Sequence, residues 1–319
     1  MIILEELWMY PIKFENIYFE KIWGGSSLKS FRENVPEGNI GESWDISCHP
    51  NGMSIVANGS LKGRTLKSII DEYGYDLMGN KVSVERFPLL IKLIDAGERL
   101  SVQVHPDDEY ALKYERDQGK TEAWYVLKAE PGAKLIIGTK DCSKEEFISA
   151  LEGNYLEKYL NEVPVKKGDC YLIKSGMVHA ICEGVTIAEI QQSSDLTYRV
   201  YDYGRPRELH KTKALDVIDF QLKSKNLRID EDKTSKNNWV SMCESEFFNI
   251  DKAVISGGLK DKSDVNTFSI LTCVDGSGTI KGDDFKENIK VGDSFLIAAT
   301  LGNYEINGRL TLLKSVPTK

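Results

Sequence analysis

The sequence lacks the features that would place the chain in a membrane, in a secretory route or on nucleic acid. No uninterrupted apolar run exceeds five residues, far short of the ~20 residues that cross a bilayer. Glu5 and Glu6 stand where a signal peptide would carry basic residues before an apolar block. The 41 basic and 49 acidic residues give a net charge of −8, which disfavours a nucleic-acid partner but not a small anion. We therefore expect a cytoplasmic protein with no membrane partner.

Cysteine and histidine are both scarce. The six cysteines form no C-x-x-C pair, which excludes a zinc ribbon and a dithiol redox motif and is typical of a reducing compartment. Only four histidines are present, namely His49, His105, His179 and His210. Any site built on imidazole must draw on these four.

The sequence does contain many short strand-like segments. Its 319 residues, 41% hydrophobic and 28% charged, have the composition of a folded protein of about two domains. Segments rich in Val, Ile, Leu, Tyr or Phe and bounded by turn residues predict strands at 53–57, 89–94, 100–105, 122–128, 134–137, 170–174, 185–191, 198–203, 251–256, 268–274, 294–298 and 309–314. Helical patterns cover only 66–73, 107–117, 143–151 and 208–220. These patterns predict a mainly β fold with a few accessory helices.

A polar stretch divides the strand-rich regions. It predicts a first domain over 1–220, a polar linker over 221–246 and a second domain over 247–319. The segments GDCYLI at 168–173 and GDSFLI at 292–297 resemble each other. Aligning them places His179 opposite Asn303, so we infer two related β-barrels of which only the first keeps the histidine. A chance likeness of two strand-turn segments is the alternative.

Four polar side chains of the first domain have the types and spacing of a metal site. Gln103 and His105 lie two apart on a predicted strand and so point to the same side of the sheet. Glu122 opens the next predicted strand, and His179 follows another. Two imidazoles, one carboxylate and one amide oxygen suit Zn²⁺ with a position left open. A hydrogen-bonded structural role is the alternative for each histidine, but unsatisfied polar groups on a barrel's inner face would be costly.

The spacing of these residues resembles the cupin superfamily. Residues 97–105 (GERLSVQVH) follow its first motif, a glycine, five residues and H-x-H, and residues 168–179 (GDCYLIKSGMVH) follow its second. The departures are Gln103 for the first histidine, Lys174 for a proline, and a long insertion before Glu122. The resemblance implies two double-stranded β-helix, or jelly-roll, barrels.

Longer segments narrow the resemblance to type I mannose-6-phosphate isomerases of the short bacterial kind. They are YFEKIWGG (18–25), GESWDIS (41–47), FPLLIKLIDAGERLSVQVHPDD (87–108), GKTEAWYVL (119–127) and GMVHAICEGVTIAEIQQSSDLTYRVYDYGR (176–205). The resemblance implies an enzyme that interconverts D-mannose 6-phosphate and D-fructose 6-phosphate through a metal-stabilised cis-enediol, with one Zn²⁺ per chain. In that family the zinc ligands fall on Gln103, His105, Glu122 and His179.

The same resemblance points to catalytic residues. It places Arg199 against the anionic intermediate or the substrate, and an ion pair with Asp195 or Asp202 is the alternative. Lys120 stands two residues before the predicted carboxylate ligand and shares its side of the strand, as a proton shuttle or a phosphate ligand. Glu189 matches a family position among inward-pointing residues, as base, as partner of the substrate hydroxyls or as support for a ligand.

The phosphate needs hydroxyl or ammonium donors. Ser101 and Lys92 are the candidates, and an interior salt bridge is the alternative for Lys92. Two other functions compete with the isomerase: an Fe(II) oxygenase built on two histidines and a carboxylate, and a sugar-phosphate sensor without catalysis. Gln103 as a fourth donor disfavours the first, and the presence of Lys120, Glu189 and Arg199 disfavours the second. The sequence leaves the oligomeric state open.

Overall fold

The computed structural model describes residues 9–230 and 236–318, which form two compact units. The central unit holds 18–43 and 92–228, and the terminal unit holds the described residues within 1–17, 44–91 and 229–319. The predicted boundaries differ from this division, because 44–91 were assigned to the first domain. The predicted linker 221–246 also contains a strand, β15 (Val240–Glu244), and part of that linker, like Glu5 and Glu6, lies outside the described residues.

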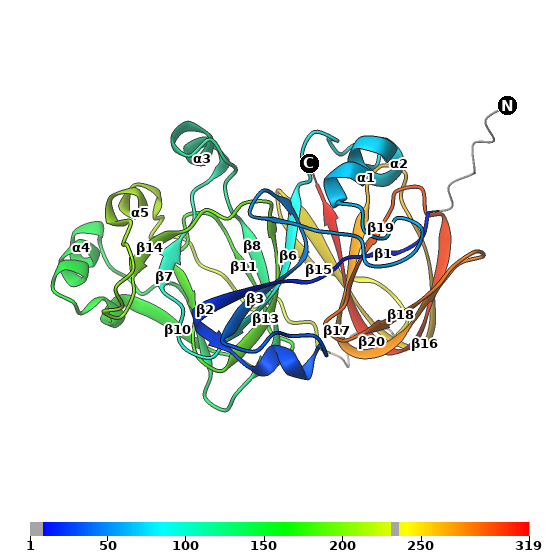
Figure 1. Cartoon of the computed structure of the whole chain (residues 1–319). Coiled ribbons are helices and arrows are strands. Elements are labelled where there is room, and N and C mark those ends of the chain that lie inside the picture. Colours follow the sequence, from blue (N-terminus) through cyan, green and yellow to red (C-terminus); the bar gives the residue numbers. More distant parts are fainter. Residues whose placement is uncertain (1–8, 231–235, 319) are drawn as a thin grey trace. The chain divides into compact units, whose positions relative to one another are not determined.

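Two sheets build the central unit (Figure 1). The six-stranded sheet has the order β11-β8-β13-β6-β2-β3, and the five-stranded sheet has the order β10-β9-β12-β7-β14. The strands of the first are β2 (Ile17–Gly25), β3 (Ile40–Ile46), β6 (Leu89–Ala96), β8 (Glu122–Ala129), β11 (Cys170–Ile173) and β13 (Val185–Gln192). Those of the second are β7 (Val102–Val104), β9 (Lys134–Thr139), β10 (Leu160–Pro164), β12 (His179–Ile181) and β14 (Tyr198–Tyr201).

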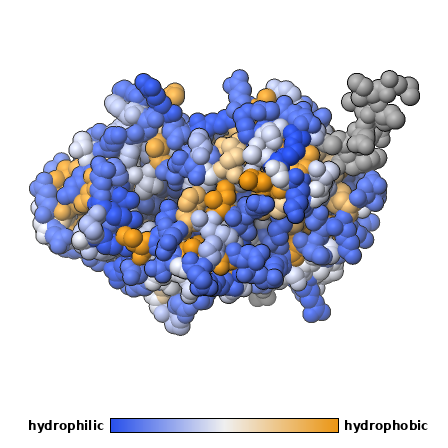
Figure 2. All heavy atoms as spheres, in the orientation of Figure 1, coloured by the Kyte–Doolittle hydropathy of each residue, from blue (hydrophilic) through white to orange (hydrophobic). Residues whose placement is uncertain are grey.

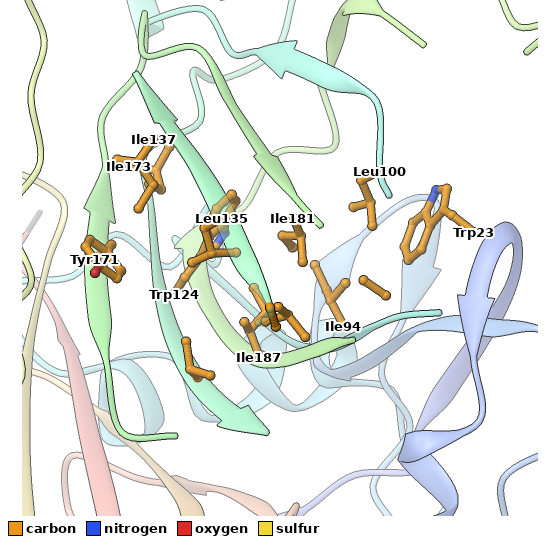
Figure 3. Close-up of a cluster of buried hydrophobic side chains, with 14 of the residues drawn as sticks. Trp23, Ile94, Leu100, Trp124, Leu135, Ile137, Tyr171, Ile173, Ile181 and Ile187 are labelled. Carbon is orange, nitrogen blue, oxygen red and sulfur yellow. The ribbon is translucent and has the colours of Figure 1, made fainter. Parts of the chain in front are cut away.

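Alternation along the strands gives the central unit a buried interior. Trp124 and Ile187 from the six-stranded sheet gather with Leu135, Ile137 and Ile181 from the five-stranded sheet in one cluster (Figure 3). This apolar interior lies between the sheets, as in the jelly-roll barrel that the sequence predicts.

Helices cover the opposite face of β7. Val102 and Val104 pack with Phe147 and Ala214 in a second cluster, so the residue between the two valines points into the barrel. The helices are α3 (Asp108–Tyr114), α4 (Lys144–Glu152) and α5 (Lys211–Val217), with 3-10 turns at Ser27–Ser30 and Leu156–Tyr159. Helix α4 begins with a capping box between Ser143 and Glu146.

The terminal unit is built on a seven-stranded sheet. Its order is β1-β19-β17-β20-β16-β15, with β18 paired to β17. The strands are β1 (Ile12–Lys13), β15, β16 (Phe248–Lys262), β17 (Ser269–Lys281), β18 (Lys286–Lys290), β19 (Ser294–Ile297) and β20 (Asn303–Pro317), with α1 (Leu66–Tyr73), α2 (Tyr75–Met78) and the pair β4 (Cys48–His49) and β5 (Gly52–Met53). Phe87 stacks on Phe268 at a centroid distance of 4.9 Å, which shows why 44–91 belong with the C-terminal strands.

The repeated G-D-x-x-L-I segments adopt the same local structure in the two units. Gly168 and Gly292 both have φ of 89°, a left-handed conformation that favours glycine. Asp169 Oδ2 and Asp293 Oδ2 each accept a hydrogen bond of 2.9 Å from the backbone N–H three residues earlier. Each turn leads into a strand. The next strand then begins at His179 in the central unit (β12) and at Asn303 in the terminal unit (β20). The two segments therefore share more than sequence.

Most predicted elements are present, and one is wrong. The helix 66–73 is confirmed at both ends, and the mainly β fold is confirmed as well. The predicted strand 53–57 is wrong: β5 ends at Met53, and Ile55 and Val56 form only isolated bridges. No helix among the described residues is long and apolar enough to span a membrane. The face drawn in Figure 2 is mainly hydrophilic, with separate hydrophobic groups.

Candidate metal centre and substrate cavity

Three strands of the central unit deliver the predicted metal ligands. Gln103 is the middle residue of β7, and Glu122 and His179 are the first residues of β8 and β12. His105 directly follows β7, and His179 pairs with Gln103 in the antiparallel register. Residues separated by more than seventy positions thus meet at one end of the barrel.

The side chains of these residues are in contact. His105 Nε2 lies 3.1 Å from His179 Nε2, and Glu122 places Oε2 3.5 Å from the first nitrogen and Oε1 3.5 Å from the second. The Gln103 amide nitrogen lies 3.3 Å from His179 Nε2. The two histidines and the glutamate are at most 1% exposed, so their polar atoms cannot be satisfied by bulk water.

The cluster has the properties of a metal site. Both carboxylate oxygens of Glu122 are buried without a hydrogen-bond partner among the described residues. His179 Nδ1 donates to the carbonyl of Met177 at 2.8 Å, so its Nε2 keeps a lone pair that faces the other ligands. Burial, together with the charge of Lys120, lowers the pKa of His105 to about 3, and burial lowers the pKa of His179. Neutral imidazoles beside a buried carboxylate could hold a metal ion.

Two titratable groups flank this cluster. Lys120 Nζ lies 3.0 Å from Glu122 Oε2. Burial alone would lower the pKa of Lys120, but the charges of Glu122 and Glu189 outweigh it and raise that pKa. Burial, followed by the charge of Glu122, raises the pKa of Glu189 to about 7. Trp124 Nε1 donates to Glu189 Oε1 at 2.9 Å, and Oε2 has no hydrogen-bond partner among the described residues.

Lys92 is surrounded by carboxylates. It is 3% exposed, and its Nζ lies 3.5 Å from Glu42, 3.8 Å from Glu189 and 3.9 Å from Asp195. This is the interior salt bridge that we set against phosphate binding for Lys92.

A polar cavity of about 310 Å³ adjoins the cluster. It is lined by Lys21, Trp23, Glu42, Lys92, Ile94, Leu100, Ser101, Gln103, Lys120, Trp124, Ile181, Glu189, Asp195, Thr197, Arg199 and Arg207. A larger depression of about 430 Å³ in the same unit is lined by residues such as Arg99 and Lys134 that pair with glutamates at the surface. That depression contains none of the predicted site residues, so the smaller cavity is the candidate site.

Arg199 reaches the cavity from β14. Its Nη1 donates to the carbonyl of Glu208 at 2.7 Å, and its Nε is buried without a hydrogen-bond partner among the described residues. Burial, followed by the charge of Arg207, lowers the pKa of Arg199. Asp202, one of the two carboxylates proposed as an alternative partner, pairs with Arg205 and Arg207.

Comparisons with known proteins identify the family. Residues 12–133 match the family model described as phosphomannose isomerase type I, catalytic domain, and residues 239–317 match mannose-6-phosphate isomerase, cupin domain. The chain is 37% identical over 320 residues to the mannose-6-phosphate isomerase of Streptococcus mutans, covering 96% of this chain and 98% of that protein. It is 35% identical to the mannose-6-phosphate isomerase ManA of Bacillus subtilis, covering 93% and 96%. The chain belongs to the type I phosphomannose isomerase family.

Solved structures of phosphomannose isomerases agree with this placement. The mannose 6-phosphate isomerase of Bacillus subtilis is 37% identical and superposes with a TM-score of 0.88, covering 96% of this chain and 99% of that one. A mutant of the Salmonella typhimurium phosphomannose isomerase is only 15% identical, yet has a TM-score of 0.77 over 97% of this chain and all of that one. The second likeness shows that the fold persists where most residues differ.

The structure of this family member also adds cavity residues that sequence reasoning missed. Lys21 and Glu42 come from β2 and β3, which the sequence did not predict as strands. Thr197 precedes β14, and Arg207 follows it in an arginine-containing loop. A signal for Lys21 was present. Lys21 and Trp23 lie two residues apart on β2, so their side chains point to the same, inward side of the strand. No local signal distinguished Arg207 from the neighbouring arginine.

Proposed function

We propose that this protein is a zinc-dependent isomerase that interconverts D-mannose 6-phosphate and D-fructose 6-phosphate. The observation that carries the proposal is the buried cluster of His105, Glu122 and His179 beside a polar cavity. Within the described part of the chain, the carboxylate oxygens of this cluster have no hydrogen-bond partner. Membership of the type I phosphomannose isomerase family and the similarity to the mannose-6-phosphate isomerase of Streptococcus mutans support the reaction.

The proposed ligands of one Zn²⁺ per chain are the two histidines, the glutamate and the amide oxygen of Gln103. Nitrogen and oxygen donors of this kind suit Zn²⁺. When bound, Zn²⁺ supplies a Lewis acid that polarises the carbonyl of the open-chain sugar. The low pKa of His105 supports the assignment, because a metal ligand must offer its lone pair near neutral pH.

Glu189 is the proposed proton-transfer group. The reaction removes a proton from C2 of the aldose and returns one to C1, so the base must exchange a proton near neutral pH. A pKa raised to about 7 supports this role. The Trp124 N–H fixes Oε1 of Glu189 and leaves Oε2 for the substrate proton.

Two cations complete the proposed set. Lys120 holds Glu122 in its ionised form, since their atoms lie 3.0 Å apart, and also lines the cavity. Arg199 carries a buried Nε that has no hydrogen-bond partner among the described residues. A guanidinium remains charged at any working pH, so Arg199 can stabilise the negative charge that develops on the intermediate.

The terminal unit is proposed to have no metal centre of its own. Among the described residues, the one cluster of His, Cys, Asp or Glu that could hold a metal lies in the central unit. Asn303 stands at the repeat position of His179, so the terminal unit lacks the histidine of the first copy.

A coupled assay tests the proposed function. Metal-stripped protein is assayed for fructose 6-phosphate formation from mannose 6-phosphate before and after Zn²⁺ is added, with His105→Ala alongside. We expect Zn²⁺ to restore activity in the wild type and not in the variant. Equal activity in stripped and reloaded protein would contradict zinc dependence. A protein that bound one metal ion but never formed fructose 6-phosphate would favour the oxygenase or sensor hypothesis instead.

A further inference from the structure

The charges that line the cavity are unevenly distributed. Five lysine or arginine side chains face three acidic ones. Lys21 pairs with Glu42 at 2.9 Å, and the same glutamate lies 3.5 Å from Lys92. Lys92 is also within 4 Å of Glu189 and Asp195. A doubly charged phosphate brought to Lys92 would therefore meet three carboxylates at short range, which is unfavourable in a buried setting.

Two arginines line the same cavity. Arg199 and Arg207 both line it, and the charge of Arg207 contributes to the lowered pKa of Arg199. Two guanidinium groups that repel each other in a partly buried cavity favour an anionic ligand between or beside them. Ser101, 3% exposed, lines the same cavity and offers a hydroxyl.

Arg207 is fixed in place by a buried carboxylate. Its Nε donates to Asp202 Oδ2 and its Nη2 to Asp202 Oδ1, both at 2.7 Å. Asp202 is 2% exposed. Burial alone would raise the pKa of Asp202, but the charges of Arg207 and Arg205 outweigh it and lower that pKa. This bidentate pair leaves Nη1 of Arg207 as the nitrogen that Asp202 does not use.

We propose that Arg207 binds the phosphate group of the substrate, with Ser101, and that Asp202 is the positioning residue that holds Arg207 in its binding orientation. The inference rests on the proposed function for the identity of the sugar phosphate. Of the two candidates that the sequence suggested, it keeps Ser101 and replaces Lys92 by Arg207. An arginine preorganised by two hydrogen bonds loses little side-chain freedom on binding, which favours affinity for a phosphomonoester.

Arg205 supplies a matched control. It also binds Asp202, through Nη2 at 2.7 Å and Nε at 3.0 Å. However, its Nη2 also donates to the carbonyl of Arg99, and it lines a separate surface depression with Arg99 and Glu98. Arg207→Gln and Arg205→Gln therefore each remove one partner of Asp202, and only the first removes a cation from the candidate site.

The experiment measures steady-state kinetics with mannose 6-phosphate and binding of inorganic phosphate by calorimetry, on zinc-loaded protein. For Arg207→Gln we expect KM and the phosphate dissociation constant to rise about 10- to 100-fold, with a smaller change in kcat. A rise of this size corresponds to the loss of one or two charge-assisted hydrogen bonds. For Arg205→Gln we expect KM and the phosphate dissociation constant to stay within about threefold of the wild-type values. Asp202→Asn is expected to raise KM by an intermediate factor while kcat is kept, because Arg207 remains but is held less firmly.

Three results would overturn the inference. Arg207→Gln with unchanged KM and phosphate binding would remove the phosphate role. Equal effects of Arg207→Gln and Arg205→Gln would show a general loss of local structure. A wild-type KM in Asp202→Asn would remove the positioning role. If the wild type fails to isomerise mannose 6-phosphate, the proposed function fails, and calorimetry with inorganic phosphate still decides the role of Arg207.

Discussion

At the scale of single residues, burial decides the chemistry of the site. The sequence placed Glu189 among inward-facing residues, but only the packed structure surrounds it with Trp124, Lys92 and Glu122 and raises its pKa to about 7. An isolated glutamate titrates near 4.5. The difference fits the base role that we propose for Glu189, and it makes the ionised carboxylate costly for stability.

Glu189→Gln should therefore increase stability above neutral pH while it abolishes activity. Below about pH 4.5 the carboxyl is protonated in both the folded and the unfolded protein, so it does not change the free energy of unfolding. Between about pH 4.5 and 7 the unfolded state loses the proton first, so wild-type stability falls as pH rises, and above pH 7 the penalty is constant, of the order of 3 kcal/mol. Denaturant unfolding of metal-free protein at pH 5 and pH 8 measures it. Glu98→Gln, at an exposed position, is the control, and a pH-independent difference between Glu189→Gln and wild type would contradict the raised pKa.

Lys120→Met should destabilise the metal-free protein by about 3 kcal/mol, because it leaves the buried carboxylate of Glu122 without its cation. Adding Glu122→Gln to that variant should recover much of the loss, since the uncompensated charge then disappears. Urea unfolding of the two single variants and the double variant gives the coupling energy. Additive effects of the two substitutions would mean that the pair does not interact.

At the scale of elements, short-range patterns were reliable. The capping residues of α4 and the turn residues of the G-D-x-x-L-I segments act on backbone groups within three residues, so the sequence is enough to predict them. The strand 53–57 failed for the opposite reason. Four of its five residues are apolar, but the segment after β5 makes only isolated bridges, and a strand needs a partner.

Gly168→Ala and Gly292→Ala should each destabilise the protein by about 1 to 2 kcal/mol. Both glycines have φ of 89°, where a side chain is strained. The added Cβ at Gly168 would also come within 3.3 Å of the Arg228 guanidinium. Thermal unfolding measures both variants, and Gly63→Ala, at φ of 86° with open space around it, controls for backbone strain alone. A neutral effect at Gly168 and Gly292 would contradict the shared turn.

At the scale of the whole molecule, the proposed metal ion would link folding to function. A ligand that binds only the folded state stabilises it by about 4 kcal/mol at a thousand times its dissociation constant. The buried cluster of His105, Glu122 and His179 exists only when β7, β8 and β12 are in place. Zinc binding and folding of the central unit should therefore be coupled.

Removal of zinc by a chelator should lower the melting temperature, and added Zn²⁺ should restore it. His105→Ala should be insensitive to both treatments, because it lacks a proposed ligand. Asn303→Ala, at the exposed repeat position in the terminal unit, should respond to both treatments as the wild type does. Differential scanning calorimetry checks all three proteins. A zinc response in His105→Ala equal to that of the wild type would place the metal elsewhere.

The sequence by itself determined what depends on residue type and short spacing: the mainly β fold, the candidate metal ligands, and the repeated turn. It also carried the resemblance that predicted the family. Only the tertiary structure decided what depends on residues far apart in the chain. It grouped 44–91 with the C-terminal strands, surrounded Lys92 with carboxylates, and fixed Arg207 on Asp202. Such assignments need the positions of several charges at once, and the interaction between charges depends on distance and burial, which a linear pattern does not contain.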